Sequence, residues 1–295
     1  MGRLVIFFLL VAIIAVHCRH RSAIAPPVET MELSDSLKGI SGLICWDDRL
    51  WAHNDRDDRN LYALNPANGS ILAYYELEST RWSRHEWEDI AQDEDFIYIG
   101  DMGNNTSGNR QDLHILRIKK EAIRHGELSV DTIFYSYSDQ QNFHPIIPNT
   151  TRFDCEAMLV SCDSIYLFTK QWIGGKTSVY SLPKSPGSHR AMLRSTHYVG
   201  GMITGATCHE DSGAVVLCGY TFFMQPFLLL LSDFSDNDFF SGTRLKIKLD
   251  LPFHQVEGIT TGNGTRYYIS NERSYLPKVH KPQKIHVVDL KSLMD

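Results

Sequence analysis

Five short motifs recur along the 295-residue chain, and each places one oxygen-bearing side chain just before a small-then-apolar step. They read Ser41-Gly42-Leu43, Glu88-Asp89-Ile90, Glu156-Ala157-Met158, Thr204-Gly205-Ala206 and Glu257-Gly258-Ile259. Successive motifs are 47, 68, 48 and 53 residues apart, about the length of one four-stranded blade of a β-propeller. Because radial repetition brings equivalent positions together on one axis, the spacing predicts an all-β fold, a five-bladed β-propeller with four-stranded blades.

The strand pattern indicates how such a ring would close. From about residue 29 onward, short strand-like runs alternate with turn residues, and no long stretch has a strong helical period. The last unit, which starts near Glu257, has one strand fewer than the others, and residues 28–33 have no other unit to join. We therefore expect the N-terminal strand to complete the last blade, which would remove an exposed sheet edge. Residues 26–295 are expected to form a single domain.

The N-terminus has the pattern of an export signal. Arg3 precedes thirteen uninterrupted apolar residues, 4–16, which suits a signal peptide and is shorter than the roughly 20 residues of a membrane-spanning helix. Cleavage after Ala25, lipidation at Cys18 and an uncleaved anchor remain alternatives. We thus expect a signal peptide over residues 1–25, or a lipoprotein signal that ends before Cys18. The protein would be periplasmic, a cell-envelope lipoprotein or secreted, with membrane contact only through a possible lipid anchor.

Composition narrows the class of partner. The formal charge of −6 and the pI of about 6.1 argue against nucleic-acid binding, which requires clustered Lys and Arg. We expect a monomer. Besides Cys18 the chain has five cysteines, an odd number that implies no dense disulfide framework. Cys208 and Cys218 flank a turn, so they are either a bridge between neighbouring strands or ordinary buried thiols.

The first residue of each motif is the candidate metal ligand. In a propeller the innermost strands line a central channel, so the five oxygens should face one point; they belong to Ser41, Glu88, Glu156, Thr204 and Glu257. Three carboxylates so close would repel one another unless a cation lay among them. Carboxylate and hydroxyl oxygens suit Ca²⁺, whereas zinc would require His or Cys. The alternative is that these residues only mark the turns that enter the inner strands.

A second set of polar and aromatic residues lies about one hairpin later in each unit. Because an up-down hairpin returns to the face where it began, both sets should lie on the same face, where binding residues commonly sit on loops. Three acids are candidates for catalysis by orienting water: Asp55, Asp101 and Glu272. The candidate ligand-binding residues are Asn54, Asn104, Arg110, Lys170, Trp172, Tyr220, Asn271 and Arg273. Each could equally belong to a tight turn.

The order Ser, Glu, Glu, Thr, Glu from Ser41 to Glu257 resembles that of calcium-activated apyrase-like nucleotidases. That family implies a secreted five-bladed propeller with one central calcium, and Asn54-Asp55-Arg56 is similar to its acidic-Arg segment. The chain departs from the family at Lys170-Gln171-Trp172, where an Arg-rich segment is expected, and at Thr204, which replaces a Ser.

Other stretches resemble bacterial envelope proteins. Ser41-Gly42-Leu43, Glu257-Gly258-Ile259 and Asn271-Glu272 are similar to segments of SdiA-regulated and esterase-like phytase propellers. Residues 87–91 and 98–105 look like those of exported propellers, especially from Bacteroidetes-like bacteria, that have no assigned activity.

Two functions follow as expectations. In the first, the protein is an exported calcium-binding propeller whose metal-bearing face binds a small polar ligand, a glycan or a protein partner. In the second, it is a calcium-dependent hydrolase of phosphate anhydrides or esters, in which Lys170, Arg110 and Arg273 hold the phosphorylated substrate. The convergence of basic residues separates the two, because a site that hydrolyses an anion needs two or three of them.

Overall fold

The computed structural model describes residues 23–294 except 57, 78–84, 210–212 and 277–278. The expected signal peptide therefore lies outside the described residues, apart from its last three. These form β1 (Ala23–Ala25), which pairs in parallel with a later strand. No helix in the described part of the chain is long and apolar enough to cross a membrane.

The described chain is almost entirely β-structure, and most strands belong to four sheets. The first sheet has the order β3 (Ile40–Trp46), β4 (Arg49–Asn54), β5 (Asn60–Leu64) and β6 (Ile71–Glu76). Eight strands form the second: β7 (Trp87–Gln92), β8 (Phe96–Asp101), β9 (His114–Lys119), β10 (Val130–Tyr137), β11 (Cys155–Ser161), β12 (Ser164–Thr169), β13 (Lys176–Pro183) and β14 (Gly187–Tyr198). The third sheet has the order β1, β18 (Thr243–Leu249), β17 (Pro226–Ser232), β16 (Ala214–Tyr220) and β15 (Met202–His209).

The fourth sheet combines the two ends of the chain. Its order is β19 (Val256–Thr261), β20 (Arg266–Asn271), β23 (Lys284–Asp289) and β2 (Glu29–Glu32). β2 runs antiparallel to β23, with Glu29 opposite Val287, so the expected pairing of the N-terminal strand is confirmed. A short hairpin of β21 (Ser274–Leu276) and β22 (Val279–Lys281) stands apart, and the helical segments are η1 (Asp35–Leu37), α1 (Lys120–His125) and α2 (Lys291–Met294).

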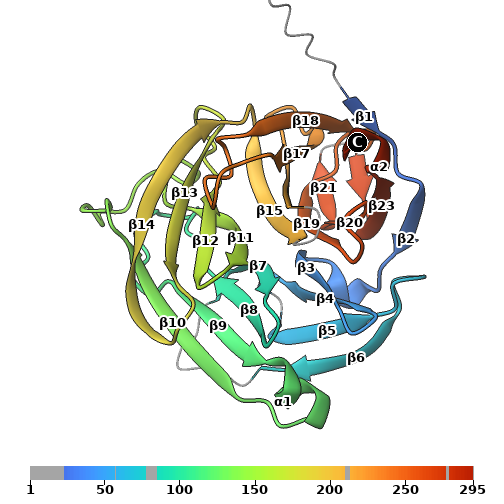
Figure 1. Cartoon of the computed structure of the whole chain (residues 1–295), viewed down its shortest axis with the longest axis horizontal. Coiled ribbons are helices and arrows are strands. Elements are labelled where there is room, and N and C mark those ends of the chain that lie inside the picture. Colours follow the sequence, from blue (N-terminus) through green and yellow to red (C-terminus); the bar gives the residue numbers. More distant parts are fainter. Residues whose placement is uncertain (1–22, 57, 78–84, 210–212, 277–278, 295) are drawn as a thin grey trace, which may run out of the picture.

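The sheets radiate from a common centre (Figure 1). The strands nearest this centre are β3, β7, β11, β15 and β19, and each contacts the next, with β19 returning to β3. Apolar clusters fill the space between neighbouring sheets; one of them contains Trp51, Trp87 and Ile99. All five motifs found in the sequence lie on these inner strands.

The sequence predicts five separate four-stranded sheets, but the strands do not divide in this way. The cause is β14, which is twelve residues long. Residues 187–191 pair in parallel with β10, whereas residues 192–198 pair antiparallel with β13. This strand therefore joins the second and third expected units into one sheet, and β1 adds a fifth strand to the next unit.

The inner strands approach one another so closely that glycine at the second motif position of two of them leaves no room for a side chain. A Cβ at Gly205 would lie 2.7 Å from the Glu257 carbonyl oxygen, and one at Gly258 would lie 2.6 Å from the Ser41 carbonyl oxygen. Asp89 takes this position in β7, where its buried carboxylate accepts hydrogen bonds from the amides of Met158 (2.8 Å) and Ala206 (3.3 Å). Asp89 thus connects three inner strands.

The cysteines of the described residues are all free thiols. Cys208 lies opposite Val215 and Cys218 opposite Gly205, so the two side chains do not face each other across the β15–β16 pair. The alternative of ordinary thiols is the one that the structure shows.

Candidate functional site

A β-bulge marks the motif in each inner strand. The pairing of the inner strand with its neighbour shifts between Ile40 and Leu43, and it shifts at the corresponding point of the other four inner strands. The unpaired residues include Ser41, Glu88, Glu156, Thr204 and Glu257. Because a bulge redirects a side chain, and bulges are frequent beside active sites, these five positions are structurally equivalent candidates for function.

The two hydroxyl groups of this set connect neighbouring strands. Ser41 Oγ donates a hydrogen bond of 2.5 Å to the carbonyl oxygen of Glu88, and Thr204 Oγ1 donates one of 2.6 Å to that of Val256. Both side chains are buried. In this structure their protons are thus used to hold β3 against β7 and β15 against β19.

The carboxylates meet a buried lysine. Lys170 Nζ lies 3.1 Å from Glu156 Oε2, and both side chains are almost completely buried. The same ammonium lies 5.0 Å from the ring centroid of Trp172 and 5.5 Å from that of Tyr220, within the range of cation–π contacts. Burial opposes the charge of Lys170, but Glu156 and the other acids around it raise its pKa well above the usual value.

Six carboxyl groups share this centre with Lys170, and we call the seven side chains the axial cluster: Asp55, Glu88, Asp154, Glu156, Lys170, Glu257 and Glu272. Burial, followed by the charge of Glu156, raises the pKa of Glu88 and of Asp154 well above the usual values. Burial also raises the pKa of Glu257, against the opposing effect of Lys170. Arg56 pairs with Asp55 from the edge of the cluster, so the six carboxyl groups face two cations and outnumber them.

Glu272 is a member of the axial cluster whose pKa is raised to near neutral pH. Burial and the charge of Asp55 raise its pKa to about 7. Such a carboxyl group exchanges protons readily at physiological pH, the property required of an acid–base group.

The Glu88 carboxylate lies in a space that depends on a glycine. Its Oε1 atom is buried and has no hydrogen-bond partner. A Cβ at Gly103 would overlap this carboxylate and would lie 3.0 Å from Glu86 Oε2. Two acidic side chains therefore extend to the same glycine. Nevertheless, no three His, Cys, Asp or Glu side chains among the described residues are already gathered as metal ligands.

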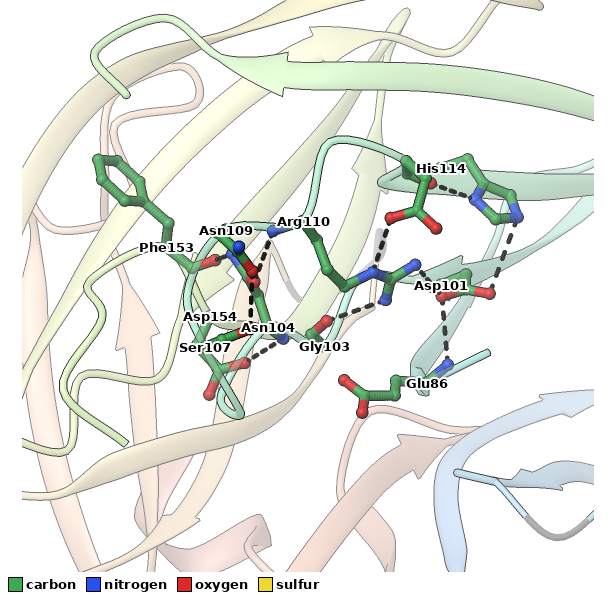
Figure 2. Close-up of polar contacts among 11 residues, drawn as sticks. Glu86, Asp101, Gly103, Asn104, Ser107, Asn109, Arg110, His114, Phe153 and Asp154 are labelled. Carbon is green, nitrogen blue, oxygen red and sulfur yellow. Dashed lines mark hydrogen bonds and ion pairs between the residues drawn. The ribbon is translucent and has the colours of Figure 1, made fainter. Parts of the chain in front are cut away.

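Arg110 is engaged within its own loop (Figure 2). Its Nη2 donates to Asp101 Oδ1 at 2.7 Å, its Nε to Asp112 at 3.0 Å and its Nη1 to the Gly103 carbonyl at 2.9 Å. Asp101 also accepts from the Glu86 amide at 3.2 Å. The structure thus pairs these two predicted site residues with each other.

Asn104 anchors the same loop to the start of β11. Its amide nitrogen donates to Asp154 Oδ1 at 2.7 Å, and its side chain donates to the Phe153 carbonyl and accepts from the Arg110 amide. The loop is therefore rigidly connected to the axial cluster through Asp154.

The remaining predicted residues lie around the centre in similar contacts. Asn54 bonds to Ser36, Gly39 and Asp58, and Asn271 bonds to Glu272, Pro282 and His286. Arg273 pairs with Asp35 and Gln283, and Asp55 with Arg56. The structure therefore brings Asp55, Lys170, Trp172, Tyr220 and Glu272 to the axial cluster, while Asn54, Asn104, Arg110, Asn271 and Arg273 hold the loops in place.

Sequence reasoning missed three residues of the site: Glu86, Gly103 and Asp154. A signal was present, because Glu86 stands two residues before Glu88 and Asp154 stands two residues before Glu156. This acid-x-Glu pattern places a second carboxyl group just ahead of the bulge in the second and third motifs.

Comparisons with known proteins bear on the fold. No family model and no curated protein matches the sequence. Among solved structures, a glutaminyl cyclase of Myxococcus xanthus aligns with a TM-score of 0.52 at 10% identity, covering 90% of this chain and 98% of that one. The WD40 repeats of RRP9 align with a TM-score of 0.42 at 10% identity, over 90% and 99% of the chains.

A hydrazine synthase of Kuenenia stuttgartiensis aligns more weakly, with a TM-score of 0.40 at 11% identity over 88% of this chain and 65% of that one. At such low identity the likeness concerns the fold alone. The radial sheets show that the chain has an all-β, propeller-like fold, and the likeness to the glutaminyl cyclase agrees with this fold.

Proposed function

We propose that this protein is an exported five-bladed β-propeller that binds Ca²⁺ through the axial cluster and a polar ligand on the same face. Buried Glu88, with an unpartnered oxygen and a raised pKa, carries the proposal. A divalent cation would supply the positive charge that Lys170 and Arg56 together do not supply. It would allow the surrounding carboxyl groups to be ionised together at neutral pH.

The donor chemistry fits calcium, since the cluster offers carboxylate oxygens without His or Cys. Glu88, Glu156 and Glu257 would be the ligands, with Asp154 next to them. Binding would require these side chains to turn toward one point, because they are not gathered as ligands in this structure. The hydroxyls of Ser41 and Thr204 would keep their contacts between strands.

The structure favours this role over phosphate hydrolysis. The three basic residues expected to hold a phosphate are each paired with a carboxylate: Arg110 with Asp101, Arg273 with Asp35 and Lys170 with Glu156. An anionic substrate would have to displace these partners and enter a centre that already has an excess of acid.

Calorimetry and thermal unfolding of the EGTA-treated protein test the calcium proposal. At a calcium concentration 100-fold above the Kd, we expect a gain of about 2.7 kcal/mol, or roughly 5 °C in Tm. Glu88→Gln should remove most of this response and stabilise the metal-free protein, because glutamine, unlike Glu88, is neutral in this buried site without taking up a proton. Glu94→Gln, at an exposed acid, is the matched control and should respond as the wild type does. A wild-type protein whose Tm and heat of mixing do not change with calcium would contradict the proposal.

A second candidate function rests on Glu272, whose pKa of about 7 suits acid–base chemistry beside a buried ammonium. The structural likeness to a glutaminyl cyclase suggests peptides with an N-terminal glutamine as the first substrates to assay, with ammonia release as the readout. Turnover should follow a pH profile that Glu272→Gln abolishes. No ammonia release by folded protein between pH 5 and 9 would exclude this candidate.

A further inference from the structure

The face that carries the axial cluster also exposes large apolar side chains. Phe222 and Phe223 are 80% and 83% exposed, Tyr198 is 74% and Ile173 is 69% exposed, and Phe253 is nearly half exposed. We call these five residues the apolar rim. Single exposed apolar residues are common on protein surfaces, but a group of this size marks an interaction site.

The course of the strands places the rim beside the axial cluster. β12 ends immediately before Lys170, and Ile173 follows in the same loop. β16 ends at Tyr220, whose ring faces the Lys170 ammonium, and Phe222 lies two residues further on. Since two residues span at most about 7 Å, the first rim side chains begin next to the cluster.

Backbone contacts join the rim loops in two pairs. The Phe253 amide donates to the Met224 carbonyl at 2.9 Å, and the Val199 amide donates to the Gly175 carbonyl at 3.0 Å. Phe222 and Phe223 contact each other edge to face, with ring centroids 5.9 Å apart.

Two bulky residues of this surface have positive φ angles, 57° at Met224 and 65° at Phe253. Such angles cost free energy for residues other than glycine, most of all for bulky ones. The fold thus maintains a strained backbone that keeps Phe253 at the surface.

The charge of the neighbouring cluster defines the occupant. We propose that the apolar rim and the axial cluster together dock a polypeptide segment in which a basic side chain or a free amine is flanked by apolar residues. The positive group would approach Glu272, while its neighbours pack on Phe222 and Phe223. The proposal rests on the proposed function only in that this face is the ligand-binding one.

Fluorescence anisotropy with short labelled peptides, acetylated and amidated, tests this. The probe Phe-Leu-Lys-Leu-Phe should bind at least about tenfold more tightly than Phe-Leu-Glu-Leu-Phe and Gly-Ser-Lys-Ser-Gly. The double variant Phe222→Ser/Phe223→Ser should weaken binding of the first probe about tenfold. Leu72→Ser, on the outer strand β6 and also exposed, is the matched control and should bind as the wild type does. Glu272→Gln should reduce the preference for Lys over Glu.

The peptide and calcium proposals fail separately. Peptide binding that is the same in calcium and in EGTA, with no calcium response of the Tm, would overturn the calcium proposal alone. A calcium response without peptide binding by the folded wild type would overturn the rim proposal alone. Two further results would also overturn the rim proposal. Equal binding of the Lys and Glu probes would identify the rim as a purely apolar surface. Sedimentation with phosphatidylcholine vesicles that depends on Phe222 and Phe223, in place of peptide binding, would identify it as a membrane-binding surface.

Discussion

The Arg110 loop and the axial cluster both contain buried carboxylates at the same ends of the inner strands, yet their charges are balanced differently. In the loop, one guanidinium is paired with Asp101 and Asp112 at 2.7 and 3.0 Å. In the axial cluster, one ammonium contacts Glu156, and the pKa values of Glu88, Asp154 and Glu257 rise well above their usual range. Buried charges that are paired hold a structure together, whereas an unbalanced group of acids points to a binding site.

Removing the cation from the balanced region should have the largest effect. Arg110→Met removes the guanidinium from the buried carboxylate of Asp101 and leaves it the Glu86 amide and, at 3.8 Å, the His114 ring, so we expect the free energy of unfolding in urea at pH 7 to fall by about 4 kcal/mol. Adding Asp101→Asn to this variant should restore part of the loss, because the uncompensated charge is then gone. A loss below about 1 kcal/mol would show that the loop does not depend on the ion pair.

In the axial cluster, removing an acidic side chain should instead raise the free energy of unfolding. Because the pKa of Glu272 is raised to about 7 in the folded protein, its contribution to stability is complete below about pH 4.5 and is lost as the pH rises through 7. The contribution of Glu272 to the free energy of unfolding should therefore be about 3 kcal/mol larger at pH 4.5 than at pH 8.

Glu272→Gln should therefore flatten the dependence of stability on pH and make the protein more stable than the wild type at pH 8. Urea unfolding at pH 4.5, 6 and 8 in EGTA measures this. An unchanged pH dependence in the variant would mean that Glu272 does not titrate with a raised pKa.

Removing an exposed ion pair should have the smallest effect on the free energy of unfolding, and it provides a reference for the buried pairs. Arg124 pairs with Asp47 at 3.2 Å, and both side chains are nearly half exposed. Water screens this pair, so Arg124→Ala should lower the free energy of unfolding by no more than about 0.5 kcal/mol in the same urea assay. A loss comparable to that of Arg110→Met would show that burial does not set the difference between the regions.

The sequence was sufficient to predict the radial β-fold because its signals are local and repeated. Each motif coincides with a bulge on an inner strand, and the unassigned run at residues 28–33 contains β2, which pairs with β23 as expected. The division into sheets was not predictable, since it depends on β14 being long enough to pair with strands of two units.

The site was predictable only in part. The position of Lys170 one hairpin after Glu156 indicated that the two would lie on the same face, and Lys170 donates a hydrogen bond to Glu156 itself. The partners of Arg110 depend on loop conformation, which the residue types do not determine. The direction of the Ser41 hydroxyl toward the Glu88 carbonyl depends in the same way on how two strands pack, not on either strand alone.

The pairing of β2 with β23 has a consequence for the order in which the protein folds. Thr30 and His286 share a hydrogen bond although they are 256 positions apart. The first strand of the last sheet is therefore synthesised near the beginning of the chain and must wait, unpaired, until nearly the whole chain has emerged. Contacts of such long range slow folding, and an unpaired strand edge can associate with other chains. Aggregation is thus a risk until the ring closes, and closure requires the strands from both ends of the chain.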